Sequence, residues 1–442
     1  MISCSLQHGL VLLLSAFSCL VAGGAAAAER TTPTRTVIAL LVDGLSGEMI
    51  GSFETPHLDR LRAEGSWSHE FLPTFPALSG PTWVSISTGC WPEHHGIVTD
   101  KFLDPELGLM DHASDVRWLS GCELIQQVAE RQGIETAALG WWGQWSASTG
   151  PSATYVSANA RLEQQVPRDP TVFLTDPERA EEIVDYLSRS PKDRPRLILG
   201  YFRGPDHNAH FHGTESPEAE HSVRQFDSAL GTILAAIDEQ PDQDQIALMV
   251  LSDHGMVPIH HVVNVRRILR RHDIEARDVS TGTTSFLYFE NKTEVQSARK
   301  RLESYSEFEV FSRNDLPEHT HLGNSGRIPD LILAALPGYY TADPDIWPLH
   351  LRPLTLWGPD FVPSPILGGG VRAAHGYAAS TPGNNGVLYA WGSGIRDGVS
   401  LGNVRMIDVH PTITTLLGIE SGNPVDGTAD HRMLRQGQEG QP

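Results

Sequence analysis

Acidic and imidazole side chains recur in four short segments that lie far apart along the chain. The segments read LLVDGL, GPDHNAH, LSDHGM and AAHGY, and each lies beside an apolar run. Carboxylate oxygens and imidazole nitrogens are both good zinc ligands, so three aspartates and three histidines suit two zinc-like divalent ions. The candidate metal ligands are Asp43, Asp206, His210, Asp253, His254 and His375.

The apolar runs beside these residues predict buried β-strands. In open α/β sheets, sites form outside the carboxyl ends of the strands, so four separate segments can deliver ligands to one rim. A single aspartate after a strand is more often a turn or a helix cap. The joint occurrence at strand ends is what indicates a metal site. The predicted strands are 36–42, 135–139, 196–202, 246–252 and 387–391.

A serine at the start of a predicted helix is the candidate nucleophile. Ser79, Gly80 and Pro81 open a helix predicted over 81–88. The free N–H groups and the dipole of a helix N-terminus suit a phosphoryl anion. A serine hydroxyl is a poor nucleophile by itself, but metal coordination can activate it. The alternative is that Ser79 only caps this helix.

Short apolar runs that alternate with amphipathic runs predict an α/β fold. Further helices are predicted over 55–64, 178–188, 215–239 and 408–417. The regular alternation of apolar and amphipathic runs ends after residue 257, where a strand-like run, a helix-like run and a Pro-rich stretch follow one another. We expect an α/β catalytic core with a small inserted α+β cap and a flexible polar tail. The expected core comprises 36–257 and 371–420, the cap 258–370 and the tail 421–442.

Composition limits the partners of the chain. It has 442 residues and a formal net charge of −21, which suits one large domain with an insertion, or two domains. A strongly acidic surface repels phosphate backbones, so we expect no binding to nucleic acid duplexes. Bound metals would still allow a small phosphate-ester substrate to approach. The sequence does not fix the oligomeric state.

The first 28 residues contain no charged side chain, and their apolar run ends in small residues. This pattern predicts a secretory signal peptide over 1–28 and therefore export, either periplasmic or secreted. The apolar run is short for a membrane span, so no stable span is expected after processing. An uncleaved anchor is the alternative. Of the four cysteines, Cys90 and Cys122 remain in the mature chain, as one disulfide or as two buried thiols.

In the order and spacing of its motifs, the chain resembles the alkaline phosphatase superfamily, close to the type I phosphodiesterase/nucleotide pyrophosphatase branch. The resemblance runs from about Thr36 to Ile419 and includes STGCWPEHHGI and MIDVHPTITTLLGI. It implies a three-layer α/β/α sandwich that holds two zinc ions. The nucleophile would lie next to the second of these ions. The implied ligand sets are Asp206, His210 and His375 for one ion, and Asp43, Asp253 and His254 for the other.

The resemblance also selects the nucleophile. In the family, the Ser or Thr nucleophile stands nine residues before the Thr of a helix-ending Thr-Gly pair. Here that Thr is Thr88, which gives Ser79 as the nucleophile and as a further metal ligand. Thr74 lies five residues too early, and Thr82 would fall inside the first helical turn.

The chain departs from the family pattern at three positions. Where the family has an Asn that contacts a phosphate oxygen, this chain has Asp100, followed by Lys101. A carboxylate would repel a phosphate oxygen unless it is protonated or turned away, and Lys101 is a candidate replacement. Ala209 replaces a common Gly. Trp83 stands where the sulfatase maturation motif has Arg, which favours a plain hydroxyl over formylglycine.

Several side chains near the predicted ligands are candidates for substrate contacts or support. Trp141 and Trp142, with Trp145, follow a predicted strand and could form an aromatic wall for a base, aryl or lipid group. The alternative is that they pack in the core or against the cap. Neighbouring histidines are expected to be solvated or to support the ligands; these are His207, His212, His260 and His261.

These features predict a metal-dependent hydrolase that cleaves phosphodiester or nucleotide pyrophosphate bonds through a phosphoseryl intermediate on Ser79. The same site could instead serve phosphomonoesters, phosphonates or sulfate esters. A metal-dependent mutase fits less well, because export removes it from central metabolism. Outside enzymes, the chain could be an exported binding protein that has lost turnover, an alternative that only Asp100 supports.

Overall fold

The computed structural model describes residues 35–111, 118–144, 150–157, 174–341, 359–364 and 370–436. Within these ranges the main sheet is built from β1 (Thr36–Val42), β2 (Ser66–Leu72), β5 (Thr136–Leu139), β6 (Tyr155–Val156), β7 (Leu197–Phe202), β8 (Ile246–Leu251), β18 (Gly386–Gly392), β19 (Val399–Ser400) and β20 (Val404–Arg405). The strand order is β19–β2–β18–β8–β1–β7–β5–β6, with β20 paired to β2. The strands β8, β1, β7, β5 and β6 run parallel, and β18 is antiparallel to both β8 and β2.

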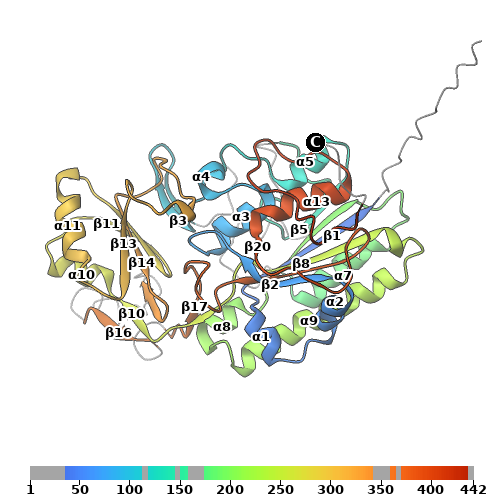
Figure 1. Cartoon of the computed structure of the whole chain (residues 1–442), viewed down its shortest axis with the longest axis horizontal. Helices are drawn as coiled ribbons and strands as arrows, with labels where there is room; N and C mark the ends of the chain where they lie inside the picture. Colours follow the sequence, from blue (N-terminus) through green and yellow to red (C-terminus); the bar gives the residue numbers. More distant parts are fainter. Residues whose placement is uncertain are drawn as a thin grey trace, which may run out of the picture. The chain divides into compact units, whose positions relative to one another are not determined.

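Helices cover both faces of the main sheet because its central strands are apolar on both faces. Along β1, Ile38 and Leu40 enter one hydrophobic cluster, whereas Val37 and Leu41 enter another, as the period of two requires. Helices α2 (Pro56–Glu64), α7 (Asp176–Leu187) and α9 (Pro217–Asp238) complete the first cluster, and α3 (Ser79–Thr88), α5 (Ile125–Arg131) and α13 (Val409–Leu417) complete the second. Figure 1 shows the two helix layers on opposite sides of the sheet. The predicted three-layer α/β/α fold is confirmed.

The described part of 258–370 contributes a second, antiparallel sheet. Its strands are β11 (Arg277–Thr281), β12 (Thr284–Tyr288), β14 (Leu331–Ala335) and β13 (Phe308–Ser312), in that order. One face packs against α10 (Val265–Arg271) and α11 (Val295–Leu302). The other face, through Phe286 and Ile332, packs against Phe75 and Val84 beside and within α3. The division of the chain into a core and an inserted cap stays a prediction.

The last described residues differ from the flexible tail expected for 421–442. Met433 and Leu434 are buried, and Leu434 forms a β-bridge with Ile395 in the loop after β18. The backbone amide of Arg396 also donates to the carbonyl of Met433. These contacts outweigh the polar composition that suggested a frayed end. Up to residue 436, the expectation of a flexible tail was therefore wrong.

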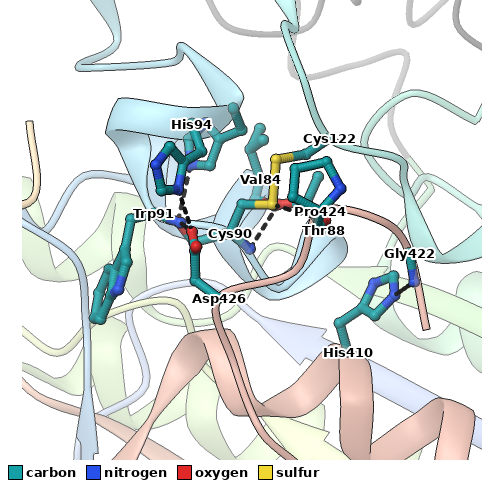
Figure 2. Close-up of a disulfide and its surroundings, with 12 residues drawn as sticks. Val84, Thr88, Cys90, Trp91, His94, Cys122, His410, Gly422, Pro424 and Asp426 are labelled. Carbon is teal, nitrogen blue, oxygen red and sulfur yellow. Dashed lines mark hydrogen bonds and ion pairs between the residues drawn. A yellow bond between two sulfur atoms is a disulfide. The ribbon is translucent and has the colours of Figure 1, made fainter. Parts of the chain in front are cut away.

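Asp426 and Gly427, shortly before Met433, form hydrogen bonds to the turn at the C-terminal end of α3. The Asp426 carboxylate accepts a 2.8 Å hydrogen bond from the Trp91 amide and lies 2.7 Å from Nδ1 of His94. The amides of Asp426 and Gly427 both donate to the carbonyl of Gly89, at 2.9 Å. Figure 2 shows these side chains around the turn that follows α3. The C-terminal segment thus holds the helix that carries Ser79.

A disulfide links this turn to the segment before α5. Cys90 follows α3 directly and is bonded to Cys122. Of the two states that the sequence left open for these cysteines, the structure has the disulfide. On the other side of the same turn, His410 of α13 binds the carbonyl of Ser87 through Nδ1 at 2.9 Å. Helix α3 is therefore tied at its C-terminal end by covalent and polar contacts.

Candidate metal centre and active site

Three neighbouring strands of the main sheet end at the predicted aspartates. Asp43 follows β1, Asp206 opens α8 (Asp206–His212) after β7, and Asp253 follows β8. Because β7 and β8 flank β1 in parallel, the three carboxylates lie at one edge of the sheet. The chain is crowded there, since Gly44 has a φ of +70° and a Cβ on it would lie 2.9 Å from Asp206 Cα. Glycine is required after Asp43.

The three histidines reach the same edge. His210 lies one turn after Asp206 on α8, and its Nε2 is 3.3 Å from Asp206 Oδ1. His375 follows β17 (Ala373–Ala374), and its Nε2 is 3.5 Å from the same oxygen. His254 follows Asp253, and its Nε2 lies 3.5 Å from Asp43 Oδ1. The structure therefore brings all six predicted ligands together.

The ligand atoms form two groups that share His254. One group comprises Asp206, His254 and His375, the other comprises Asp43, Asp253 and His254, and the atoms of each group lie within 4.8 Å of one another. The rings of His254 and His375 stack with centroids 3.5 Å apart. His210 joins the first group through its contact with Asp206. The arrangement places His254 between two adjacent ligand sets.

Each of the three histidines uses Nδ1 for a backbone carbonyl. His210 Nδ1 lies 2.7 Å from the carbonyl of Ala373, and His375 Nδ1 lies 2.9 Å from that of Ala77. His254 Nδ1 lies 3.0 Å from the carbonyl of its own neighbour, Gly255. A proton on Nδ1 serves these contacts and leaves the Nε2 lone pair facing the carboxylates. This second contact is the usual way in which proteins orient a histidine ligand.

The carboxylates have buried oxygens that no hydrogen-bond donor reaches among the described residues. These atoms are Asp43 Oδ1, Asp206 Oδ1 and Asp253 Oδ2. Buried acceptors without a donor are costly, and here they face imidazole lone pairs, which are also acceptors. Only cations satisfy such a set. The residues therefore fit two divalent metal ions with oxygen and nitrogen ligands.

The pKa shifts reflect the same crowding of negative charge. Burial, followed by repulsion from Asp253 and Asp206, raises the pKa of Asp43 well above its usual value. Burial also raises the pKa of Asp253. Burial opposes ionisation of Asp206 as well, but the neighbouring His210, together with His375 and His254, outweighs it and holds the pKa of Asp206 below its usual value. A bound cation would relieve the repulsion among all three carboxylates.

Ser79 lies at the rim of this cluster. It is the first residue of α3, and its half-buried Oγ is 3.1 Å from His254 Nε2. The residue at the N-cap position is Leu78, whose side chain makes no cap hydrogen bond. Ser79 is therefore not the N-cap of α3.

Asp100 also reaches the first turn of α3. Its Oδ1 accepts a 2.8 Å hydrogen bond from the amide of Gly80, the residue after Ser79. Burial raises the pKa of Asp100 to about 6, although the Gly80 hydrogen bond opposes the rise. Lys101 begins β3 (Lys101–Asp104) and is half-buried. The Asp100 carboxylate is thus the side chain that accepts the Gly80 amide at the start of the nucleophile helix.

Tyr201 is a residue of the site that the sequence reasoning missed. It lies in β7, and its hydroxyl donates a 2.7 Å hydrogen bond to Asp43 Oδ2. Trp83 of α3 stacks on its ring at 4.5 Å between centroids. Burial raises the pKa of Tyr201 well above its usual value, so the hydroxyl keeps its proton and remains a donor. The only signal in the sequence was one amphipathic residue in an otherwise apolar strand.

Trp141 and Trp142 pack in the core, as the alternative to an aromatic wall for the substrate had it. Trp141 is 1% exposed, and its Nε1 donates a 3.0 Å hydrogen bond to Ser87 Oγ. Trp142 is 5% exposed and belongs to the cluster beneath the second sheet. The interpretation as substrate contacts was wrong for these two residues, because both indoles serve packing. Trp145 lies outside the described residues.

The four neighbouring histidines belong to neither ligand group. His207 lies on the exposed side of α8 with its ring 5.1 Å from that of Phe211. His212 Nδ1 lies 3.6 Å from Glu218 Oε1. His261 is the first residue of β10 (His261–Val263), and its ring stacks against that of Tyr339. His260, which precedes β10, is exposed.

Comparison with known proteins places the chain among phosphodiesterases. The family model described as type I phosphodiesterase/nucleotide pyrophosphatase matches residues 37–377. An uncharacterized pyrophosphatase/phosphodiesterase of Schizosaccharomyces pombe is 27% identical over 66% of this chain and 61% of its own length, so the match spans less than two thirds of that relative. A bis(5′-adenosyl)-triphosphatase of Bos taurus is 25% identical over 95% of this chain and 86% of its own.

Solved structures agree on the fold. Murine ectonucleotide pyrophosphatase/phosphodiesterase 5 superimposes with a TM-score of 0.74 at 18% identity, covering 89% of this chain and 98% of that chain. An inactive form of the same murine protein, in complex with AMP, gives the same TM-score. The family match covers well over half of the chain and includes the segments of all six metal-ligand candidates. The chain therefore belongs to the type I phosphodiesterase/nucleotide pyrophosphatase family, whose members are hydrolases.

Proposed function

We propose that this protein is an exported two-zinc hydrolase that cleaves phosphodiester or nucleotide pyrophosphate bonds through a phosphoseryl intermediate on Ser79. One observation carries the proposal. Ser79 Oγ lies 3.1 Å from Nε2 of His254, the side chain that both candidate ligand groups share. A hydroxyl at that place is next to any ion that His254 holds, so it is the group best placed for activation.

The ligand sets divide between two ions. Asp206, His210 and His375 would hold one, and Asp43, Asp253 and His254 the other. Zinc suits this mixture of oxygen and nitrogen donors, and other divalent metals remain compatible with it. Two ions bound there would activate the serine hydroxyl and neutralise charge on the attacking and leaving oxygens.

The reaction proceeds by double displacement. Ser79 Oγ attacks phosphorus in line with the leaving oxygen, so a bond from Oγ to phosphorus forms as the bond to the leaving group breaks. A water molecule then attacks the same phosphorus, and Ser79 leaves with its hydroxyl restored. Two inversions give net retention of configuration at phosphorus.

Nucleotides are the substrate class that the relatives favour. One relative carries the name bis(5′-adenosyl)-triphosphatase, and one related solved structure holds AMP. Both names concern molecules with a phosphate ester on a nucleoside. We propose that the substrate of this chain is a small phosphodiester or a nucleotide with a pyrophosphate bond.

Three features support export. The apolar segment at the start of the chain resembles a signal peptide. The disulfide between Cys90 and Cys122 is the kind of bond that persists in oxidising compartments. Relatives include proteins named ectonucleotide pyrophosphatase/phosphodiesterase. None of the helices in the described ranges combines the length and apolar character that a bilayer crossing requires.

A panel of chromogenic substrates tests the reaction class. Purified protein is assayed with a bis-aryl phosphodiester, the aryl phosphomonoester and the aryl sulfate, each with added zinc and with chelator. The proposal predicts zinc-dependent turnover with preference for the diester. Faster turnover of the monoester or the sulfate would reassign the substrate class while keeping the site. Metal binding without turnover of any substrate would favour the exported binding protein.

A further inference from the structure

A fourth carboxylate lies at the start of the nucleophile helix. Asp100 lies in a different segment of the sequence from the strand ends that supply the candidate metal ligands. Its Oδ1 accepts a 2.8 Å hydrogen bond from the amide of Gly80. Leu78, at the N-cap position, offers no side-chain acceptor. Asp100 therefore caps α3 from a separate segment, one residue away from the candidate nucleophile.

The cap places a negative charge where a phosphoryl oxygen would be bound. The amide of Gly80 belongs to the first turn of α3 and is one of the donors that such an oxygen would use. If two divalent ions are bound and the histidines are neutral, the four positive charges of the ions exceed the three negative charges of the ligand carboxylates by one. The carboxylate of Asp100 reduces that charge to zero.

Substrates of the candidate reactions differ in charge. A phosphodiester has one negative charge, whereas a phosphomonoester or inorganic phosphate carries nearly two above its second pKa of about 6. The additional charge of the monoester meets the Asp100 carboxylate at close range. Charge repulsion at a few ångströms in a partly buried site is large enough to separate the two classes.

We propose that Asp100 determines specificity by disfavouring dianionic phosphomonoesters and inorganic phosphate relative to monoanionic diesters. The proposal rests on the function proposed above, because it concerns substrates of the same site. It also has a consequence for turnover. Hydrolysis of a diester yields a monoester with one more negative charge than the substrate, so the same carboxylate favours release of the product.

The alternative role of Asp100 is structural, as a helix cap and nothing more. The variant Asp100→Asn separates the two roles, because the amide oxygen of Asn still accepts a hydrogen bond from Gly80 while the charge is gone. Asp100→Ser is a second neutral variant that keeps an acceptor, in case the first does not fold. Asp185→Asn, at an exposed position of α7, removes the same charge elsewhere and serves as the matched control.

Two measurements at pH 8 test the proposal on zinc-loaded protein. The first is the dissociation constant of inorganic phosphate by calorimetry, and the second is the ratio of kcat/KM for the aryl diester to that for the aryl monoester. Asp100→Asn should bind phosphate about tenfold more tightly or better, and the ratio should fall by a similar factor. Asp185→Asn should behave as the unmodified protein in both measurements.

Unchanged phosphate affinity and an unchanged ratio in folded Asp100→Asn or Asp100→Ser would overturn the proposal and leave Asp100 as a cap. This outcome is distinct from failure of the proposed function. If the unmodified protein turns over no diester, the reaction class is wrong. The calorimetric comparison would then still decide whether Asp100 repels a dianion.

Discussion

Tyr201 donates a 2.7 Å hydrogen bond to Asp43 Oδ2 and so fixes a carboxylate whose other oxygen faces His254. The contact joins the interior of the main sheet to the candidate metal centre. Trp83 stacks on the tyrosine ring, so the phenol has little freedom to turn away. Asp43 is therefore held in one orientation before any metal binds.

Removal of the Tyr201 hydroxyl should lower the metal affinity of one site and leave the fold intact. We expect Tyr201→Phe to lower zinc affinity at the Asp43 site by about ten- to a hundredfold, the usual effect of losing a group that orients a ligand. Competition with a chromophoric chelator measures the affinity. Tyr186→Phe, a tyrosine on α7, is the matched control and should leave it unchanged. Equal zinc affinity in both variants would mean that Tyr201 does not position Asp43.

Asp253→Asn should have opposite effects with and without metal. Burial raises the pKa of Asp253, which means that its charge destabilises the metal-free folded state at neutral pH. With chelator, the neutral side chain should raise the free energy of unfolding, because no buried charge remains at this position. With zinc, the variant should be less stable than the unmodified protein, because a ligand is lost. Urea unfolding with chelator and with zinc measures the change in the free energy of unfolding that Asp253→Asn causes. A change of the same sign under both conditions would contradict the assignment of Asp253 as a metal ligand.

His410 should make the fold sensitive to acid. Its Nε2 accepts a 3.0 Å hydrogen bond from the amide of Gly422, and burial lowers its pKa to about 4. The unfolded chain, with a histidine pKa of about 6.5, binds the proton first, so stability falls as the pH drops from about 6.5 toward 4. Between pH 7 and pH 5 this group should cost about 2 kcal/mol.

Comparison of variants isolates that contribution. In urea unfolding, His410→Gln should lose about 2 kcal/mol less between pH 7 and pH 5 than the unmodified protein does. The exposed His319→Gln should retain the full loss. If His410→Gln loses as much stability on acidification as the control, buried His410 is not a source of the acid sensitivity.

The C-terminal segment should contribute to stability in spite of its polar composition. Leu434 is 4% exposed and lies in the cluster beneath α13. We expect Leu434→Ala to lower the free energy of unfolding by about 2–5 kcal/mol, as for other buried leucines. Leu107→Ala, at a leucine that is 53% exposed, should change it by about 0.5 kcal/mol or less. Equal effects would mean that the end of the chain is detached in solution.

The sequence predicted the sheet and the clustering of the candidate metal ligands at its edge, because both rest on strong, local patterns. Runs such as TVIALLV are apolar at every position, which marks strands buried on both faces, and the ligands follow at their ends. Helices with a clear amphipathic period were placed within a few residues; the one predicted over 215–239 is α9, Pro217–Asp238.

Features that depend on long-range contacts were not predicted. Strand β2 reads SWSHEFL and pairs with β18 across some 320 residues of chain, so no local apolar run marks it. The burial of Leu434 likewise depends on partners distant in sequence. The hydrogen bonds of Tyr201 to Asp43 and of Asp100 to Gly80 cross between segments in the same way. Patterns within one segment carry no information on such pairs.

Trapping the covalent intermediate tests whether Ser79 is the nucleophile. Zinc-loaded protein is mixed with the aryl diester, quenched in acid within the first turnovers, digested, and examined by mass spectrometry. We predict an aryl phosphoryl adduct on Ser79, which keeps one of the two aryl groups of the substrate on phosphorus and is absent with chelator. Turnover should fall by about a thousandfold or more in Ser79→Ala. Zinc-dependent turnover that persists in Ser79→Ala, or an adduct on another residue such as Thr82, would contradict the account.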